Sequence, residues 1–494
     1  MWWHSFREIV SMLFFLLNIV LSVGCSIVLI SQKNDPVKTL SWVIIMLSLP
    51  YIGIVLYFLF GRNLRKEKIY SRKGAGDARL KAQLSHQMLE RFHNASELPP
   101  EIAHYHKLIV QNLKSSQSML LCSDKIDIYF SGKEAITAMY QAMEQAQKHI
   151  HLQSFILEDD KIGNAVKELL IRKSRQGVEV RLIFDGYGGR KLGKRYISEL
   201  KEAGVEVLVF SPFRFILLPP LANYRNHRKL LIVDGNVGFL GGVNIADRYC
   251  DGGVFTEWRD THIRVEGESV MSLQASFLLD RFFIMNKDLR KRGKYFPRID
   301  LNAMMRGDSL VKRYYMQTIS SGPDSDWQAI MQCFFTAITQ AKRYVHIITP
   351  YYIPSETISD AIKITALSDV EVSIMVPEKS DTHITTAATH SYFSELLDAG
   401  VNIYMFEKGF NHSKVLSIDG EYCIIGSANM DNRSFMHNFE VTSVIFDREC
   451  AKVIDNKFNE DLKRCIKVEP DQWNRRPYIT KVAESAARLV SPLL

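Results

Sequence analysis

The stretch NHRKLLIVDGNVGFLGGVN, residues 226–244, has a near copy in NHSKVLSIDGEYCIIGSAN, residues 411–429. Both copies read H-x-K-x4-D, followed six residues later by G-[GS]-x-N. The apolar run before each Asp-Gly pair predicts a β-strand that ends in a tight turn, with a second strand returning. Residues two apart on a strand face the same side. We therefore expect each histidine to project beside its lysine.

Self-similarity extends beyond this motif, so the body of the chain is an internal duplication. In each half the predicted order is strand, helix, strand, helix, strand and then the motif. This alternation predicts an α/β fold with a largely buried sheet in each half. The matching segments are 149–156 with 344–353, 178–185 with 370–377, and 199–210 with 395–406.

The two halves differ in one spacing. Glu199 precedes His227 by 28 residues, whereas Glu395 precedes His412 by 17, so the first half carries 11 extra residues before its motif. They fall within the apolar stretch 211–226. Two interpretations stay open for this stretch, which are ordinary core packing and a surface that contacts lipid or an acyl chain.

The repeated residues His227, Lys229, His412 and Lys414 are the candidates for chemistry. One H-x-K-x4-D would be weak evidence, but two copies at equivalent places of a duplication exclude coincidence. The alternative is a pair of hairpins that only pack, which would bury a histidine and a lysine twice at a desolvation cost. The motif aspartates, Asp234 and Asp419, lie in the predicted turns, and this position favours a structural role for them.

The first sixty residues predict a membrane hairpin. Residues 9–30 and 40–60 are two uncharged, strongly apolar runs of 22 and 21 residues, and about 20 apolar residues span a bilayer as a helix. The alternatives are a cleaved signal peptide for the first run and a buried core helix for the second. Pro50 lies inside the second run, which a membrane helix tolerates.

Basic residues gather directly after the second run. Residues 62–73 hold six basic side chains against one acid, Glu67, and so carry more than half of the net charge of +8. This cluster predicts a cytoplasmic location for the remaining chain by the positive-inside rule, next to an anionic membrane surface. A nucleic-acid-binding protein would spread its basic residues over the working domains, so we expect no nucleic-acid partner.

Other features are less specific. The 494 residues suffice for two or more domains, and seven scattered cysteines without a CxxC pair favour reduced thiols. Residues 74–117 read as a helical linker. Residues 478–494 carry an apolar helical stripe, which either packs on the core or, helped by Arg475 and Arg476, contacts a membrane interface.

The two motifs resemble the HKD signature of the phospholipase D superfamily. The resemblance implies duplicated phospholipase D-like domains, each a mixed sheet flanked by helices, with one active site at their interface. It implies His227 as the nucleophile on phosphorus and His412 as the acid and base, an assignment by analogy because the sequence is symmetric. The phosphate oxygens would be bound by Lys229, Lys414, Asn244 and Asn429. Asp234 and Asp419 enter the site on family grounds alone.

A nucleophilic imidazole needs its far nitrogen held by a carboxylate. The duplication aligns WRDTHIRVE, residues 258–266, with NFEVTSVIF, residues 438–446, and so matches Asp260 to Glu440. We expect these two as the orienting partners. For Asp260 a salt bridge with Arg259 or Arg264 is the alternative. Gly242 stands where the second copy has Ser427, which argues against a hydroxyl role at that position.

Within the superfamily the whole chain resembles bacterial cardiolipin synthases. The segments that show this resemblance are PYIGIVLYFLFGRN, GGVNIADRY, WRDTH, SSGPDSDW and TPYYIP. The resemblance implies transfer of a phosphatidyl group between two phosphatidylglycerol molecules, giving cardiolipin and glycerol, with no cofactor and no metal. Alternatives are a phospholipase D or a phosphatidylserine synthase with the same covalent step, and a catalytically silent membrane scaffold. The expected parts are a hairpin over residues 1–61, a linker over 62–117, and phospholipase D-like domains over 118–310 and 311–494.

Overall fold

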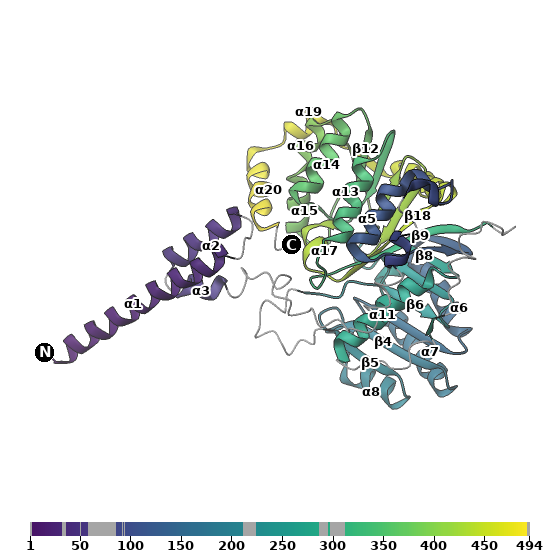
Figure 1. Ribbon diagram of the computed structural model, residues 1–494, viewed down its shortest axis with the longest axis horizontal. Coiled ribbons are helices and arrows are strands. Elements are labelled where there is room, and N and C mark those ends of the chain that lie inside the picture. Colours follow the sequence, from purple (N-terminus) through teal and green to yellow (C-terminus); the bar gives the residue numbers. More distant parts are fainter. Residues whose placement is uncertain are drawn as a thin grey trace. The chain divides into compact units, whose positions relative to one another are not determined.

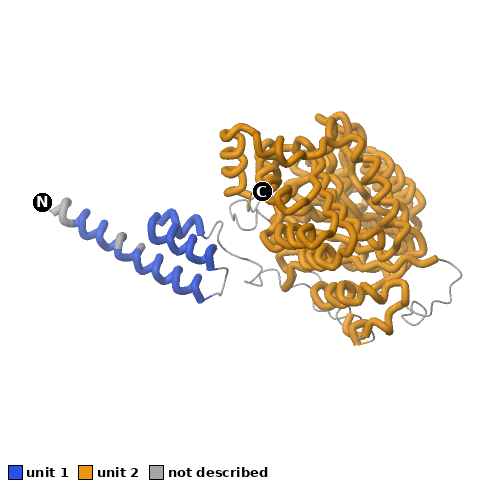
Figure 2. Tube along the Cα trace, turned by 90° about the horizontal axis from the view of Figure 1, so that it is seen from above, with its two compact units in different colours: residues 1–69, 213–224 blue, residues 70–212, 225–494 orange. Residues whose placement is uncertain are grey.

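The computed structural model describes residues 2–31, 36–49, 51–57, 85–90, 92, 94–210, 224–285, 295–296 and 312–491. The chain divides into two compact units, Met1–Ile69 with Phe213–Tyr224, and Tyr70–Pro212 with Arg225–Leu494 (Figure 2). The basic segment 62–73, residues 211–223 of the apolar stretch and the end of the second predicted span lie outside the described residues.

The N-terminal unit holds a long helix, α1 (Trp2–Ser31), and two shorter ones, α2 (Pro36–Ser48) and α3 (Ile52–Leu56). The part Phe6–Ser31 is long and apolar enough to cross a membrane. It packs against α2, where the Ser22 hydroxyl donates to the Met46 carbonyl at 3.3 Å. The second predicted span is not one continuous helix, since α2 ends at Ser48 and Pro50, which has no N–H to donate, follows.

The second unit contains both halves of the duplication (Figure 1). Ahead of the repeats lie η2 (Ala95–Glu97), η3 (Ala103–Tyr105), α5 (His106–Ser116) and β1 (Leu120–Ser123). The first repeat contains β2 (Lys125–Ser131), α6 (Gly132–Glu144), β3 (His149–Ser154), α7 (Lys161–Arg175), β4 (Glu179–Asp185), α8 (Lys194–Glu202), β5 (Glu206–Phe210), β6 (Leu230–Val233), β7 (Val237–Gly241), α10 (Arg248–Asp251), β8 (Trp258–Glu266) and α11 (Val270–Met285).

The second repeat follows the same order with additional short elements. It contains β9 (Tyr314–Ser321), α13 (Ala329–Thr339), β10 (Tyr344–Ile348), β11 (Tyr352–Ile353), α14 (Glu356–Leu367), β12 (Glu371–Pro377), α15 (His383–His390), α16 (Phe393–Asp398), β13 (Asn402–Phe406), β14 (Phe410–Asn411), β15 (Val415–Ile418), β16 (Tyr422–Gly426), β17 (Met430–Asp431), α17 (Asn432–Met436), β18 (Glu440–Phe446), α18 (Arg448–Leu462), β19 (Cys465–Lys467), α19 (Pro470–Asn474) and α20 (Tyr478–Val490).

The sheets confirm the α/β duplication with mixed strand directions. In the first repeat β3, β4 and β5 are parallel, and β6 joins β3 antiparallel. In the second, β10, β12 and β13 are parallel, and β15 joins β10 antiparallel. The orders are β14-β8-β7-β6-β3-β4-β5, with β2 on β8, and β1-β9-β18-β16-β15-β10-β12-β13-β19. A separate two-stranded sheet pairs β11 with β17.

Strand membership crosses the expected domain boundaries twice. β1 pairs with β9 and so joins the second sheet, although the first domain was expected to begin at residue 118. β14 of the second repeat pairs with β8 of the first sheet. The segment expected as a linker also contributes to the core, because α5 buries Leu108 and Ile109 in the cluster that contains α13.

The two repeats contain three apolar cores, and the third of these joins the repeats. One core lies between the second sheet and helices α5, α13, α14, α15 and α16, and another between the first sheet and helices α6, α7 and α8. The third contains residues of both sheets together with α11 and α18. The repeats therefore share a core, and the edges that carry the motifs are fixed relative to each other. All seven cysteines are free, and four of them are buried.

Candidate active site

Each motif forms the expected hairpin. β6 and β7 are antiparallel around Asp234-Gly235, and β15 and β16 are antiparallel around Asp419-Gly420. Both aspartates have positive φ, 55° and 56°, a left-handed conformation that short polar side chains tolerate. One detail differs from the expectation, since each strand begins one residue after the motif lysine.

The turn aspartates anchor a neighbouring strand. The Asp234 carboxylate accepts hydrogen bonds from the backbone N–H groups of residues 147, 148 and 149 at 2.7–2.8 Å, at the start of β3. The Asp419 carboxylate does the same for residues 342, 343 and 344 at 2.7–2.9 Å, at the start of β10. This geometry favours the structural role that the turn position predicts over contact with substrate.

The backbone N–H of each motif histidine donates a hydrogen bond to the opposite repeat. The His227 N–H donates to the Phe439 carbonyl at 2.9 Å, and the His412 N–H donates to the Arg259 carbonyl at 2.7 Å. The next residues along those partner strands are Glu440 and Asp260. Main-chain hydrogen bonds thus place a carboxylate of one repeat beside the imidazole of the other.

The side chains follow this crossed arrangement. His227 Nδ1 lies 2.9 Å from Glu440 Oε1, and His412 Nδ1 lies 2.7 Å from Asp260 Oδ2. Both carboxylates are fully buried. A carboxylate at Nδ1 fixes the tautomer with a proton on that nitrogen and leaves Nε2 with its lone pair. The arginines weighed as partners of Asp260 bind other acids, Arg259 to Asp461 and Arg264 to Asp127 and Glu266.

The two carboxylates have different surroundings. Glu440 also accepts from the Ser427 hydroxyl and, at 3.2 Å, from Asn438 Nδ2. Asp260 accepts from its neighbour's N–H, and a Cβ atom at Gly242 would collide with its carboxylate. The glycine that replaces the second copy's serine therefore makes room for Asp260, which sequence comparison alone did not indicate.

The motif lysines are buried and face the backbone of their histidines. Lys229 Nζ donates to the His227 carbonyl at 2.6 Å, and Lys414 Nζ donates to the His412 carbonyl. Burial lowers the pKa of Lys229 to about 7 and that of Lys414 to about 8, with the buried carboxylates opposing the shift. Neither lysine is among the residues that line the cavity between the repeats, but the charges of both act on the two imidazoles.

The surroundings of both imidazoles favour their neutral form. Burial lowers the pKa of His227 to about 4, and the charges of Lys229 and Lys414 act in the same direction against Glu440. Burial and the same two lysines lower the pKa of His412 well below its ordinary value. Burial raises the pKa of Asp260 against the pull of Lys414. For Glu440 burial alone would raise the pKa, but His227 and Lys229 outweigh it and the pKa is lowered.

A cavity of about 810 Å³ between the repeats contains both histidines, together with Asn244 and Asn429. Asn244 Oδ1 accepts from the Ile156 N–H at 3.0 Å, while Asn429 Nδ2 donates to Asp431 at 3.0 Å. Both amides are therefore held in place. Further lining comes from aromatic residues, threonines and three arginines, Arg225, Arg248 and Arg433.

The sequence analysis did not identify these arginines as site residues. It also did not identify the two residues that donate to Glu440, Ser427 and Asn438. The arginines lie outside the repeated motifs, so duplication did not point to them. The inference from Gly242 against a hydroxyl role was wrong for Ser427, whose hydroxyl donates to Glu440. An anionic headgroup entering the cavity would meet these three guanidinium groups. Arg248 is also paired with Glu158, and the lining includes two acids, Asp381 and Asp431.

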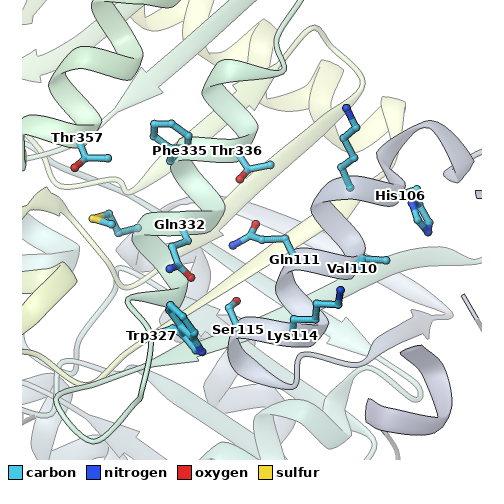
Figure 3. A pocket seen from close by; sticks show the side chains of 12 residues that line it. His106, Val110, Gln111, Lys114, Ser115, Trp327, Gln332, Phe335, Thr336 and Thr357 are labelled. Atoms are coloured by element: carbon cyan, nitrogen blue, oxygen red, sulfur yellow. The ribbon is translucent and has the colours of Figure 1, made fainter. Parts of the chain in front are cut away.

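A second cavity of about 840 Å³ lies between α5 and α13 (Figure 3). It is lined by Trp327, Phe335 and Gln332 from one side and by Gln111 and Lys114 from the other. No predicted site residue lines it. This cavity is slightly larger than the one that contains the histidines. We identify the cavity with the paired histidines and carboxylates as the candidate active site because of its chemistry.

Comparison with known proteins agrees with this arrangement. Residues 139–271 and 334–462 match the family model described as cardiolipin synthase, PLD-like domain, and residues 20–62 match the phospholipase D-nuclease N-terminal model. A cardiolipin synthase of Geobacillus sp. strain WCH70 is 38% identical over 482 residues, covering 96% of this chain and 93% of the relative. One from Geobacillus kaustophilus is 36% identical with the same coverage.

A solved structure shares the fold at low sequence identity. The phosphatidylserine synthase of Haemophilus influenzae has a TM-score of 0.59 and 14% identity, covering 78% of this chain and 99% of the other. The family match extends over both repeats, and the relatives align over nearly their whole length. The chain belongs to the cardiolipin synthase family of proteins with paired phospholipase D-like domains.

Proposed function

We propose that this protein transfers a phosphatidyl group from one phosphatidylglycerol to another and releases glycerol, giving cardiolipin. The observation that carries the proposal is the pair of neutral imidazoles in one cavity, each with a buried carboxylate on Nδ1. One can attack phosphorus while the other handles the proton. The relatives named cardiolipin synthase support the choice of lipid substrate.

In the first step His227 Nε2 forms a bond to phosphorus and the bond from phosphorus to the glycerol oxygen breaks. His412 gives its proton to that oxygen, so glycerol leaves neutral. Burial and the two lysines favour neutral His412. The negative charge of the bound phosphodiester opposes this shift, and His412 Nε2 takes up a proton from water as the substrate binds. In the second step His412 takes the proton of the acceptor's terminal hydroxyl, the alkoxide attacks phosphorus, and His227 is released.

His227 is the proposed nucleophile because its carboxylate partner is more firmly held. Glu440 accepts from Ser427 and Asn438 besides His227. This keeps the imidazole in the tautomer whose Nε2 lone pair faces the cavity. Lys229 and Lys414 bind the non-bridging phosphate oxygens and offset the charge that develops there, with Asn244 and Asn429 beside them.

We assign Asp234 and Asp419 to anchoring the motif hairpins and not to substrate contact. Their carboxylates already accept three backbone N–H groups each. We propose the two domains over residues 118–310 and 311–494, the bounds expected from the sequence. β1 of the first domain pairs in the second sheet, and β14 of the second domain pairs in the first sheet.

The membrane arrangement is also a proposal. α1 crosses the bilayer, since the 26 residues of Phe6–Ser31 span about 39 Å as a helix. The segment that contains α2 and α3 crosses the bilayer in the opposite direction. The basic residues 62–73 that follow it keep the catalytic unit on the cytoplasmic side. Labelling of cysteines introduced at positions 34 and 70 with an impermeant maleimide in intact cells tests this. Label at 34 and none at 70 is expected, and the reverse pattern rejects it.

The activity test uses purified full-length protein in mixed micelles with labelled phosphatidylglycerol and a chelator. Cardiolipin and glycerol in equal amounts are expected, and His227→Ala and His412→Ala should abolish both products. Phosphatidic acid as the main product would identify water as the acceptor and make the protein a hydrolase. Phosphatidylserine formed from CDP-diacylglycerol and serine would instead identify a phosphatidylserine synthase. An inactive parent would favour the scaffold.

A further inference from the structure

The C-terminal helix α20 turns its apolar side chains away from the protein. Ile479 is 74% exposed and Leu489 is 83% exposed, with Val482 between them at 43%. These residues lie on one side of the helix by their spacings of three, seven and ten. The side that packs inward carries Glu484 and Ala487, which are buried. Of the two interpretations open from sequence, core packing of the apolar stripe is therefore wrong.

Polar contacts fix this orientation. Arg476 donates to both carboxylate oxygens of the buried Glu484, at 2.5 and 3.0 Å, and its guanidinium stacks on the Trp473 ring. At the other end Arg488 donates to Glu395 at 2.7 Å. A bidentate pair between arginine and a buried carboxylate defines geometry well. The outward apolar face is thus a consequence of how the helix is held.

α20 is connected to the active-site cavity through α15, whose C-terminal end it contacts where Arg488 donates to the Ser391 carbonyl. α20 packs against α15, which stands beside it in Figure 1. The start of α15 lines the cavity through Thr382 and Thr385. Ile384 on the same turn is 45% exposed, and Val254, which also lines the cavity, is 96% exposed. Exposed apolar side chains therefore occur at the cavity rim as well as on α20.

We propose that the outward face of α20 binds the surface of the lipid bilayer and seats the active-site cavity against it. This deepens the proposed function and rests on it for the choice of lipid. An amphipathic helix with separate aliphatic side chains enters the headgroup boundary of a bilayer. Arg475 is exposed just before α20 and adds a positive charge that suits anionic headgroups such as phosphatidylglycerol. Arg476 does not take part, because Glu484 already binds it.

The functional consequence concerns how substrate reaches the histidines. A phosphatidylglycerol molecule keeps its acyl chains in the bilayer while its headgroup enters the cavity. Docking by α20 places the cavity rim at headgroup level, so neither lipid has to leave the membrane. The membrane anchor alone holds the unit near the bilayer without orienting it, and orientation is what α20 would add.

The first experiment measures docking without catalysis. Full-length protein is reconstituted into phosphatidylcholine vesicles that contain phosphatidylglycerol with a photoreactive acyl chain. After illumination, lipid adducts are mapped on peptides. Adducts on residues 478–490 are expected, with none on α18, which packs on the opposite face of the second sheet from α15. Absence of adducts on α20 would reject the proposal whether or not the protein makes cardiolipin.

The second experiment uses matched substitutions. Val482→Glu on α20 is compared with Val453→Glu on α18, because these valines are 43% and 44% exposed. On vesicle phosphatidylglycerol the first variant should lose about tenfold in rate, a free-energy change of about 1.4 kcal/mol. The second variant should match the parent. On monomeric short-chain phosphatidylglycerol all three proteins should be equal.

Three results would overturn the inference. Val482→Glu could retain parental activity on vesicles, which means that the face does not touch lipid. It could lose activity equally on short-chain monomers, which means that the change disturbs the catalytic unit. It could dissociate an oligomer in sedimentation, which means that a second copy of the chain covers the face. A parent that makes no cardiolipin from either substrate rejects the proposed function, and the adduct map then decides on docking.

Discussion

Replacing Glu440 by glutamine tests the crossed histidine–carboxylate pairing most directly. The substitution keeps the shape of the side chain and removes its charge. Glu440 is fully buried, and its oxygens lie 2.9 and 3.1 Å from His227 Nδ1. The ion–dipole hydrogen bond to the imidazole is lost, and an amide N–H can donate to Nδ1 instead. That would move the ring proton to Nε2, the atom that must attack phosphorus.

The expected loss follows from this geometry. A hydrogen bond to a charged group contributes about 1.5–3 kcal/mol. Because about 1.4 kcal/mol corresponds to a factor of ten, kcat should fall about 10- to 150-fold. A His227 imidazole with its proton on Nε2 should bring the loss of kcat toward the upper end of this range. Asp260→Asn should give a loss of the same order through His412, whose Nδ1 lies 2.7 Å from that carboxylate.

The assay follows cardiolipin and glycerol from labelled phosphatidylglycerol in mixed micelles under saturating substrate. Thermal unfolding of each variant separates loss of fold from loss of chemistry. A positioning role also predicts that kcat falls while KM stays near the parental value. Glu440→Gln with kcat within twofold of the parent and an unchanged melting temperature would refute the reasoning, and the buried carboxylate would then be purely structural.

Three further predictions follow from the site. The profile of kcat/KM against pH should fall on the acid side as His227 protonates near its pKa of about 4. On the alkaline side it should fall first as His412, whose pKa is lowered, loses its proton, and more steeply above pH 7–8 as Lys229 and Lys414 lose theirs; a profile with no steeper fall up to pH 10 would contradict the lysine roles. Asp419→Ala should lower the unfolding free energy by about 2–4 kcal/mol through lost hydrogen bonds to a charged group while the folded fraction keeps activity within a few-fold, and a stable but inactive variant would contradict anchoring. Ser427→Gly removes one donor to the charged Glu440 carboxylate and should reduce kcat about tenfold, the lower end for a hydrogen bond to a charged group. Gly242→Ser should disrupt Asp260 and cost far more; equal effects of the two substitutions would contradict the different surroundings of the two carboxylates.

Sequence reasoning reached the hairpins, the α/β duplication and the matched carboxylates because these features are periodic or repeated. It could not say which histidine each carboxylate serves. Asp260 follows His227 along the chain and Glu440 follows His412, so a reader of the sequence has no reason to cross them. The crossing depends on main-chain pairing between the repeats, at the His227 N–H and the His412 N–H.

Two other differences have local physical causes. The second apolar run is long enough for a span, yet it is divided into α2 and α3 around Pro50, which removes one hydrogen bond of the helix because it has no N–H. The apolar stripe of α20 was recognised, but hydrophobicity predicts that such a face turns inward. The Arg476–Glu484 pair turns it outward, and an ion pair between side chains eight residues apart has no signature in hydrophobic periodicity.

The crossed pairing also gives a reason for the duplication. A single repeat would contain a histidine, a lysine and a carboxylate, but its carboxylate points to the other repeat's histidine. The strand that carries each carboxylate also fixes the backbone of the opposite histidine. One repeat alone would therefore leave its imidazole without a partner on Nδ1 and with no second imidazole for the leaving group. Joining two copies in one chain supplies all four groups together. The copies also differ beside the two carboxylates, at Ser427 and Gly242, and this difference is compatible with the proposed division into a nucleophile side and a proton-transfer side.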